Sequence, residues 1–487
     1  MDIGKSVQTA SKWSLLTELL SKLTSPVVNM ILARLITPEA FGLVATITMV
    51  TSFADIFTDA GFQKYIVQKK ETSIDDLDKD TDVAFWTNLS LSIFLWFLIF
   101  LFRNGLAGAV GNPELGNAIA VAALSLPLTS FSSVQMARYR REFDFQTLFW
   151  AKLVGIVIPL GITIPLAFVL RSFWAIVIGN LMVNLSNAVL LTVRSRWKPQ
   201  RYYNFARLKS MLSFSLWTLT EQLLGWANLN VGIFVVGKYL SDYYLGLYKT
   251  SMAMTNQVMM IMVNVFSPVL FAALSRLKDN KDEFREMYYS IIGKTGFIVL
   301  PLGIGIFIYR NLFTLILLGS QWGEASSFVG LWGMLRALNI VFGYYSMEVF
   351  VSLGKPQYSV LTQILELAVL LPVLMITVQY GYTAVYFARC GVVIWSMVVE
   401  MSVLKIVAGI SIGKTLKNTI QFFTGACLMG VLGMLLLRIN EGVVWSFISV
   451  LLCIAFYFFV MYLCPSTRDT LKELLGLLKT HKNLQEK

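Results

Sequence analysis

Long apolar segments follow one another along most of the chain, separated by short polar connections. An apolar run of about 20 residues is enough to cross a bilayer as a helix. The runs here are too long and too continuous for the strands of a transmembrane barrel, so the pattern predicts an all-α integral membrane protein. We predict fourteen spans, at 12–35, 39–62, 83–102, 117–136, 149–170, 173–193, 211–237, 244–273, 288–308, 326–353, 358–378, 383–404, 418–437 and 443–463.

Two segments of the chain resemble each other at an offset of 204 residues, Trp13–Leu43 and Trp217–Leu247. The offset contains six predicted spans, an even number, so the two copies would have the same orientation. A membrane protein built from two such repeats is most often a transporter with a site between its halves. The ungapped alignment pairs Trp13 with Trp217, Arg34 with Lys238, Thr37 with Ser241 and Gly42 with Gly246.

The duplication predicts two six-helix lobes followed by two further helices. We expect an N-terminal lobe at 1–193, a basic and aromatic linker at 194–210 and a C-terminal lobe at 211–405. The last two spans occupy 406–464, outside the duplication. The tail at 465–487 has leucines on one helical face and is expected to rest on the membrane surface as an amphipathic helix.

Composition and charge agree with this class of protein. Hydrophobic residues make up 56% of the chain and charged residues only 14%, far from the balance of a soluble protein. With both termini in the cytoplasm, 27 of the 40 Lys and Arg residues fall on the cytoplasmic side. The net charge of +12 is therefore an orientation and lipid-headgroup signal, and no nucleic-acid partner is expected. The acidic segment 72–82 is expected to be a solvated cytoplasmic loop.

Ionisable residues at bilayer depth are the functional candidates, because each costs about 2.5–3.5 kcal/mol there unless it is paired or hydrated. Four cations would suit an anionic substrate such as a diphosphate. They are Lys22, Lys249, Lys294 and Arg336. Lys22 also allows a self-contained ion pair with Glu18, one turn earlier. Three acids are candidates for coupling transport to a proton or Na⁺, namely Asp55, Glu221 and Glu366. Lys152, Glu348 and Glu400 lie nearer span ends, and Arg389 lies about a turn and a half inside its span. All four are expected to act as anchors.

The sequence offers little for catalysis or metal binding. It has one histidine, in the tail, and its four cysteines form no CxxC pair. It contains no P-loop, no GxSxG and no HExxH motif. We therefore expect no enzyme activity, no metal and no cofactor.

Several segments of the N-terminal lobe resemble the polysaccharide flippases, the O-antigen, colanic-acid and teichuronic-acid exporters. These belong to the multidrug/oligosaccharidyl-lipid/polysaccharide superfamily. The segments are LARLITPEAFGLVA at 32–45, FADIFTDAGFQKYIVQKK at 53–70, VAFWTNLSLS at 83–92 and ARYRREFDFQTL at 137–148. The resemblance implies two six-helix lobes and two extra helices, as the repeat predicts.

The resemblance also implies a function. Such proteins move an undecaprenyl-diphosphate-linked oligosaccharide repeat unit from the cytoplasmic to the periplasmic leaflet of the bacterial inner membrane by alternating access. The headgroup would enter a basic cavity between the lobes while the polyprenyl tail stays in lipid. A polysaccharide polymerase and a chain-length regulator are implied as protein partners. Two alternatives stay open, a multidrug extruder of the same superfamily and a membrane polymerase or ligase. A basic interior counts against the first, and the absence of a sizeable outer loop counts against the second.

Overall fold

The computed structural model describes residues 24–59, 62–69 and 74–464, together with Trp13, Thr17, Leu20, Thr467 and Arg468. Every regular element in this described part is helical, which confirms the predicted all-α class. Contacts divide the chain into two compact units, Met1–Lys249 and Thr250–Lys487. Lys22 lies outside the described residues, and so does the predicted amphipathic tail apart from Thr467 and Arg468.

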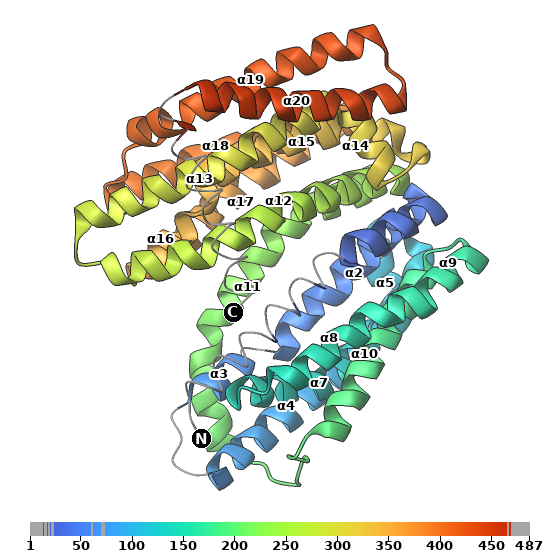
Figure 1. The fold of residues 1–487 in the computed structure, drawn as a ribbon. Helices are drawn as coiled ribbons and strands as arrows, with labels where there is room; N and C mark the ends of the chain where they lie inside the picture. Colours follow the sequence, from blue (N-terminus) through green and yellow to red (C-terminus); the bar gives the residue numbers. More distant parts are fainter. Residues whose placement is uncertain are drawn as a thin grey trace. The chain divides into compact units, whose positions relative to one another are not determined.

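The first unit begins, in its described part, with helical residues 24–35 and ends inside α12 (Figure 1). Its elements are α2 (Pro38–Asp59), α3 (Phe62–Gln68), α4 (Ile74–Leu101), α5 (Arg103–Ala109), η1 (Pro113–Leu115), α6 (Gly116–Ala122), α7 (Ser125–Arg141), α8 (Phe145–Ile158), η2 (Pro159–Thr163), α9 (Ile164–Leu170), α10 (Trp174–Arg194), α11 (Phe205–Tyr239) and the start of α12 (Asp242–Leu277).

The second unit contains the rest of α12 and all later elements. They are α13 (Lys281–Ile308), α14 (Arg310–Leu317), η3 (Ser320–Ala325), α15 (Ser326–Asn339), η4 (Ile340–Tyr344), α16 (Ser346–Ser352), α17 (Gln357–Thr377), η5 (Val378–Tyr380), α18 (Tyr382–Ala408), α19 (Ile412–Ile439) and α20 (Val443–Leu463).

The described helices agree with a multi-pass membrane protein. Eleven of them are long and apolar enough to cross a membrane, and α12, which bends by 53°, makes a twelfth if it counts as one span. Every predicted span from the second to the fourteenth falls on a described helix or on a run of consecutive ones. The total of fourteen stays a prediction, because most of the first span is not described and α11, which carries the predicted seventh span, is not among these candidates.

Two predicted spans contain a segment of wider helix. In one, the π-helix η4 separates α15 from α16, and in the other the π-helix η2 begins at Pro159 between α8 and α9. Proline removes a backbone donor and clashes with the preceding turn, which explains the second break. π-Helical turns inside α-helices occur frequently at functional sites, so the residues around η4 are candidates for a functional site.

The two copies of the repeat contact each other reciprocally in the first unit. A β-carbon on Gly42 of α2 would lie 2.0 Å from the backbone oxygen of Asp242. A β-carbon on Gly246 of α12 would lie 1.8 Å from the backbone oxygen of Pro38. Pro38 and Asp242 are themselves related by the offset of 204, so the contact has local two-fold character, with each copy offering the same surface. Small residues let membrane helices approach this closely.

Charged residues at the start of α4 correct the expectation of a solvated loop at 72–82. Asp80 is only 2% exposed as a side chain, bonds Lys69 and accepts from Arg207 at 2.6 Å. Asp82, likewise buried, accepts from the backbone N–H of Gln200 at 2.9 Å. The acidic run is helical from residue 74 onward because cations of three neighbouring elements compensate its charge.

The same cluster attaches the predicted linker to the first unit. Trp197 is buried against Phe85, and Trp86 Nε1 donates to the backbone oxygen of Gln200 at 2.7 Å. Residues 194–210 therefore pack on α4 instead of running free along a surface.

The ion pairs in this cluster shift the pKa values of its cations. Burial lowers the pKa of Lys69, but the hydrogen bond and charge of Asp80 outweigh it and leave the pKa above its ordinary value. Hydrogen bonds to Asp76 and Asp80 raise the pKa of Arg207. A cation with a raised pKa contributes stability below its unfolded value, and that contribution is lost as the pH rises through the folded value. For Lys69 the loss falls above about pH 10.4.

In the second unit, α13 is the central helix. It packs against α15 on one side and against α19 on another, and α20 packs on α19 (Figure 1). Tyr457 of α20 donates its hydroxyl to the backbone oxygen of Phe297 of α13 at 2.8 Å. The two helices beyond the duplication are thus tied directly to the core of this unit.

We predict that Gly42→Ala and Gly246→Ala each destabilise the protein by about 1–3 kcal/mol, because the new methyl group meets backbone oxygen that cannot turn aside. Thermal unfolding of the purified protein in detergent measures this as a lower Tm. Gly105→Ala is the matched control, since nothing lies within 4 Å of its β-carbon position and alanine favours the helix. Equal Tm values for all three variants would contradict the close approach.

Candidate functional site

Lys249 of α12 is an embedded cation whose one hydrogen-bond partner is a neutral group. Its Nζ donates to Thr48 Oγ1 of α2 at 2.6 Å. Thr48 in turn donates to the backbone oxygen of Val44 at 2.8 Å. Lys249 forms no ion pair within the described part of the chain. An ammonium group with three donors and one bonded hydroxyl keeps capacity for an anionic ligand.

The two candidate acids of the first unit differ in their surroundings. On α2, Asp55 Oδ1 accepts from Thr58 Oγ1 at 3.0 Å and from Thr129 Oγ1 at 3.3 Å. On α11, Glu221 makes no hydrogen bond or ion pair with any described residue and is half-buried. Asp55 is therefore held in place by two hydroxyl groups, whereas Glu221 has its full accepting capacity free of described partners.

A polar chain joins two helices of the second unit, α15 and α18, next to η4. Arg336 Nη1 donates to Asn339 Oδ1 at 2.7 Å, and Asn339 Nδ2 donates to Glu400 Oε2 of α18 at 3.2 Å. The lack of a side chain at Gly343 makes room for this carboxylate, since a β-carbon there would lie 1.8 Å from Glu400 Oε2. The π-helix η4 and the polar chain of Arg336, Asn339 and Glu400 therefore lie next to each other.

Within this hydrogen-bonded chain, Arg336 keeps donors that are not used. Its Nε atom is buried without a hydrogen-bond partner, and its guanidinium lies 5.9 Å from the centroid of the Tyr344 ring. A buried N–H without a partner costs about 1–3 kcal/mol, more when it is charged, unless a ligand or water meets it. Arg336 therefore keeps a donor unused, and its binding of an anion stays a prediction.

Glu366 and Arg389 form an ion pair whose charges also act on Arg336 and Glu400. Arg389 Nη1 lies 3.2 Å from Glu366 Oε1, and the side chains are 8% and 23% exposed. The guanidinium also lies 5.4 Å from the centroid of the Trp332 ring. Arg389 is buried and paired, so the expectation that it acts as an anchor is wrong. The carboxylate of Glu366, a candidate for ion coupling, already has a resident cation.

The remaining candidates are less informative. Lys294 lies on α13, is half-buried and is not free of partners. Lys22 falls outside the described residues, so its expected role stays a prediction. Glu400, expected near an end, lies well inside α18 because that helix continues to Ala408.

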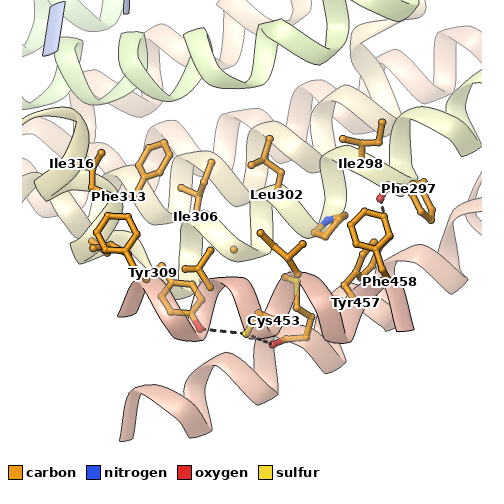
Figure 2. Close-up of a pocket in the computed structure, with 17 residues that line it drawn as sticks. Phe297, Ile298, Leu302, Ile306, Tyr309, Phe313, Ile316, Cys453, Tyr457 and Phe458 are labelled. Atoms are coloured by element: carbon orange, nitrogen blue, oxygen red, sulfur yellow. Dashed lines mark hydrogen bonds between the residues drawn. The ribbon is translucent and has the colours of Figure 1, made fainter. Parts of the chain in front are cut away.

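An apolar cavity of about 420 Å³ lies among α13, α14, α19 and α20 (Figure 2). Phe297, Leu302, Phe313 and Phe458 are among the side chains that line it. The hydroxyl of Tyr309 and the thiol of Cys453 lie 3.3 Å apart and satisfy each other. The cavity can therefore hold a hydrocarbon chain but offers little to a charged group.

Two cavities of a different character lie in the first unit. One of about 210 Å³ is lined by α2 and α10, and one of about 440 Å³ is lined by α7, α8 and α10. The smaller cavity includes Thr48, the partner of Lys249, and the larger includes Arg140 and Lys152. Sequence reasoning missed the asparagines of α10 that line both cavities, although their spacing puts them on one helical face.

The described residues contain no group of three or more His, Cys, Asp or Glu side chains that could hold a metal ion. The described residues provide groups suited to binding. These are embedded cations with unused donors, amide and hydroxyl groups that face cavities, and an apolar pocket.

We predict that Glu366→Leu and Arg389→Leu each destabilise the protein by about 3–5 kcal/mol, because each leaves a buried charge without its partner. The double variant should recover most of that loss, and thermal unfolding measures the interaction between the two sites. The exposed pair Asp75–Lys79, 2.5 Å apart, is the matched control and should change stability by less than about 1 kcal/mol. Additive effects at 366 and 389 would show that the pair is not coupled.

Comparisons with known proteins place the chain in a family. The sequence profile of the family described as "Polysaccharide biosynthesis protein" matches residues 31–327. Among individual relatives, lipopolysaccharide biosynthesis protein WzxC of Escherichia coli K12 is 22% identical over 66% of this chain and 65% of its own length. Succinoglycan biosynthesis transport protein ExoT of Rhizobium meliloti is 23% identical over 69% of this chain and 67% of its own length. The chain thus matches about two thirds of the length of these relatives.

Solved structures show the same fold at low sequence identity. The lipid II flippase MurJ in an inward closed conformation superposes with a TM-score of 0.73 at 13% identity, over 93% of this chain and 98% of that one. An inward-facing multidrug transporter of the MATE family gives a TM-score of 0.59 at 15% identity, over 80% and 94% of the two chains. The chain has a MurJ- and MATE-like fold and belongs to the polysaccharide biosynthesis protein family.

Proposed function

We propose that this protein is a lipid-linked oligosaccharide flippase. It moves an undecaprenyl-diphosphate-linked repeat unit from the cytoplasmic to the periplasmic leaflet of a bacterial inner membrane, with both termini in the cytoplasm. The observation that carries the proposal is a pair of membrane-embedded cations, Lys249 and Arg336, which form no ion pair with described residues and keep unused donors. Membership of a polysaccharide biosynthesis family and a flippase-like fold support the choice of substrate class.

The diphosphate is the group that these cations would meet. Leaving water costs a diphosphate much of its hydration, and charge-assisted hydrogen bonds from Lys and Arg replace part of it. Lys22 and Lys294 are proposed as further members of the same set. Embedded cations with unused donors disfavour the cationic drugs that a multidrug extruder would carry, because like charges repel.

Alternating access requires a contact that closes one side and can open. The reciprocal approach of Gly42 and Gly246 lies next to the turns that the charge pattern puts on the outer side. We assign to it the closed outer gate.

The polyprenyl tail is proposed to stay at membrane depth throughout. The apolar cavity beside α13 and α20 offers part of it a protein surface, since its lining is almost wholly hydrocarbon (Figure 2). The headgroup and the tail would thus meet different parts of the chain.

Coupling to a proton or Na⁺ is proposed for Glu221 or Asp55 before Glu366, whose carboxylate is engaged by Arg389. A polysaccharide polymerase and a chain-length regulator are the proposed protein partners, acting on the unit after it has crossed.

The proposal is tested by locating the lipid-linked repeat unit in a strain that lacks this gene. Intact spheroplasts are treated with a membrane-impermeant enzyme that modifies the terminal sugar. We expect the unit to accumulate out of reach on the cytoplasmic face and the wild-type gene to restore its exposure. A unit that is exposed but unpolymerised in the deletion strain would mean that the protein acts after flipping.

We predict that Lys249→Gln and Arg336→Gln each reduce the rate of exposure by about 10-fold, the effect of losing one charge-assisted hydrogen bond of about 1.5 kcal/mol. The same spheroplast assay measures it. Lys405→Gln, at an exposed position near the end of α18, is the control and should behave as wild type. Wild-type rates for both cavity variants would remove the two cations from the mechanism.

A further inference from the structure

Three asparagines form a polar stripe on α10. Asn180, Asn184 and Asn187 are spaced by four and three residues, which puts them on one face of the helix. The helix is otherwise largely apolar and is among those able to cross a membrane. An amide without a hydrogen bond in an apolar interior costs a few kcal/mol, so such a stripe needs a polar partner.

The stripe faces the two cavities of the first unit. Asn180 and Asn184 line the smaller cavity, Asn187 lines the larger, and Val183 lines both. The cavities therefore follow one another along α10. The amides at the two ends of the stripe are about 10 Å apart along the helix axis, from a rise of 1.5 Å per residue.

No described protein group satisfies these amides. The side chains of Asn180, Asn184 and Asn187 make no hydrogen bond with described residues, and Asn187 Oδ1 is fully buried without a partner. Other asparagines of the same unit are bonded: Asn88 donates to Ser133 Oγ at 3.1 Å, and Asn112 donates to Asp242 Oδ1 at 2.8 Å. The amides of α10 are therefore available to hydrogen-bond a ligand that occupies the cavities.

The two ends of this space carry cations. At the larger cavity, Arg140 and Lys152 are accessible, and none of the lining residues that the structure describes is acidic. Arg140 Nη1 also donates to Gln63 Oε1 at 3.2 Å, which leaves its other donors available. At the smaller cavity, Thr48 connects the space to Lys249.

We propose that this space is a saccharide-reading site, in which the α10 asparagines bind sugar hydroxyl groups. An amide both donates and accepts, as a hydroxyl does, so asparagine pairs with sugars and discriminates them by the position of each hydroxyl. Before the unit crosses, Arg140 and Lys152 hold the diphosphate at the predicted cytoplasmic side while the sugars extend along Asn187, Asn184 and Asn180. Lys249 and Arg336 meet the diphosphate only during the crossing. The inference rests on the proposed function and names the part of the chain that selects the sugar.

The test uses the full-length protein in lipid nanodiscs and two synthetic probes. One probe is undecaprenyl diphosphate, and the other is undecaprenyl diphosphate linked to a hexose disaccharide. We expect Asn184→Leu and Asn187→Leu each to weaken binding of the disaccharide probe by about tenfold and to leave binding of undecaprenyl diphosphate unchanged. Lys152→Gln should weaken both probes.

Controls separate a lost site from a lost fold. Leu185→Ala changes the exposed side of the same helix and should bind both probes as wild type does. The Asn→Leu variants should keep the wild-type Tm, since they remove unsatisfied amides. If leucine does not fit, Asn184→Ala and Asn187→Ala are used in place of the leucine variants. Equal weakening of both probes, or of neither, by the asparagine variants would overturn the sugar assignment.

The outcomes also distinguish this inference from the function on which it rests. If the wild-type protein neither binds nor translocates the disaccharide probe, the flippase proposal fails. If it translocates that probe and the asparagine variants do so equally well, only the saccharide-reading site is wrong.

Discussion

The close approach of two glycines is the constraint on which the first unit depends. Gly42 and Gly246 bring backbone against backbone, so neither position tolerates a side chain while the contact is made. The contact fixes the register between the two copies of the repeat and packs α2 against α11 and the start of α12. That register in turn places the Nζ of Lys249 beside Thr48. One backbone contact thus helps to determine where Lys249, a proposed substrate-binding cation, lies.

The protein treats its embedded charges in two ways. Glu366 and Arg389 satisfy each other, and Asp80 is shared between Lys69 and Arg207, so these groups hold helices together. Lys249 and Arg336, in contrast, are bonded through neutral groups and keep donors unused. Retaining such groups in a membrane costs free energy that a purely structural role would not repay. The distinction separates the charges that hold the fold together from those that we propose bind a substrate.

Much of this architecture could be predicted from the sequence, because long apolar runs and the repeat are visible in one chain. The offset of 204 residues correctly paired Gly42 with Gly246. Hydropathy could not reveal that the acidic residues before the third span are helical and partnered, since their cations come from α3, α7 and α11. It also assigned an anchoring role to Arg389 and Glu400, because periodicity does not show which face of an apolar helix is buried. The α10 stripe was visible as a spacing, yet its meaning required the cavities.

A reversible disulfide across the outer contact tests the central claim most directly. Asn112 Nδ2 lies 2.8 Å from Asp242 Oδ1 beside the glycines, so these two residues are replaced by cysteine after the four native cysteines are replaced by serine. The yield of the oxidised cross-link is measured first. Translocation of an undecaprenyl-diphosphate-linked disaccharide is then measured in proteoliposomes. The account predicts that oxidation stops translocation and that a reductant restores it. Equal rates in the fully cross-linked and reduced protein would contradict it.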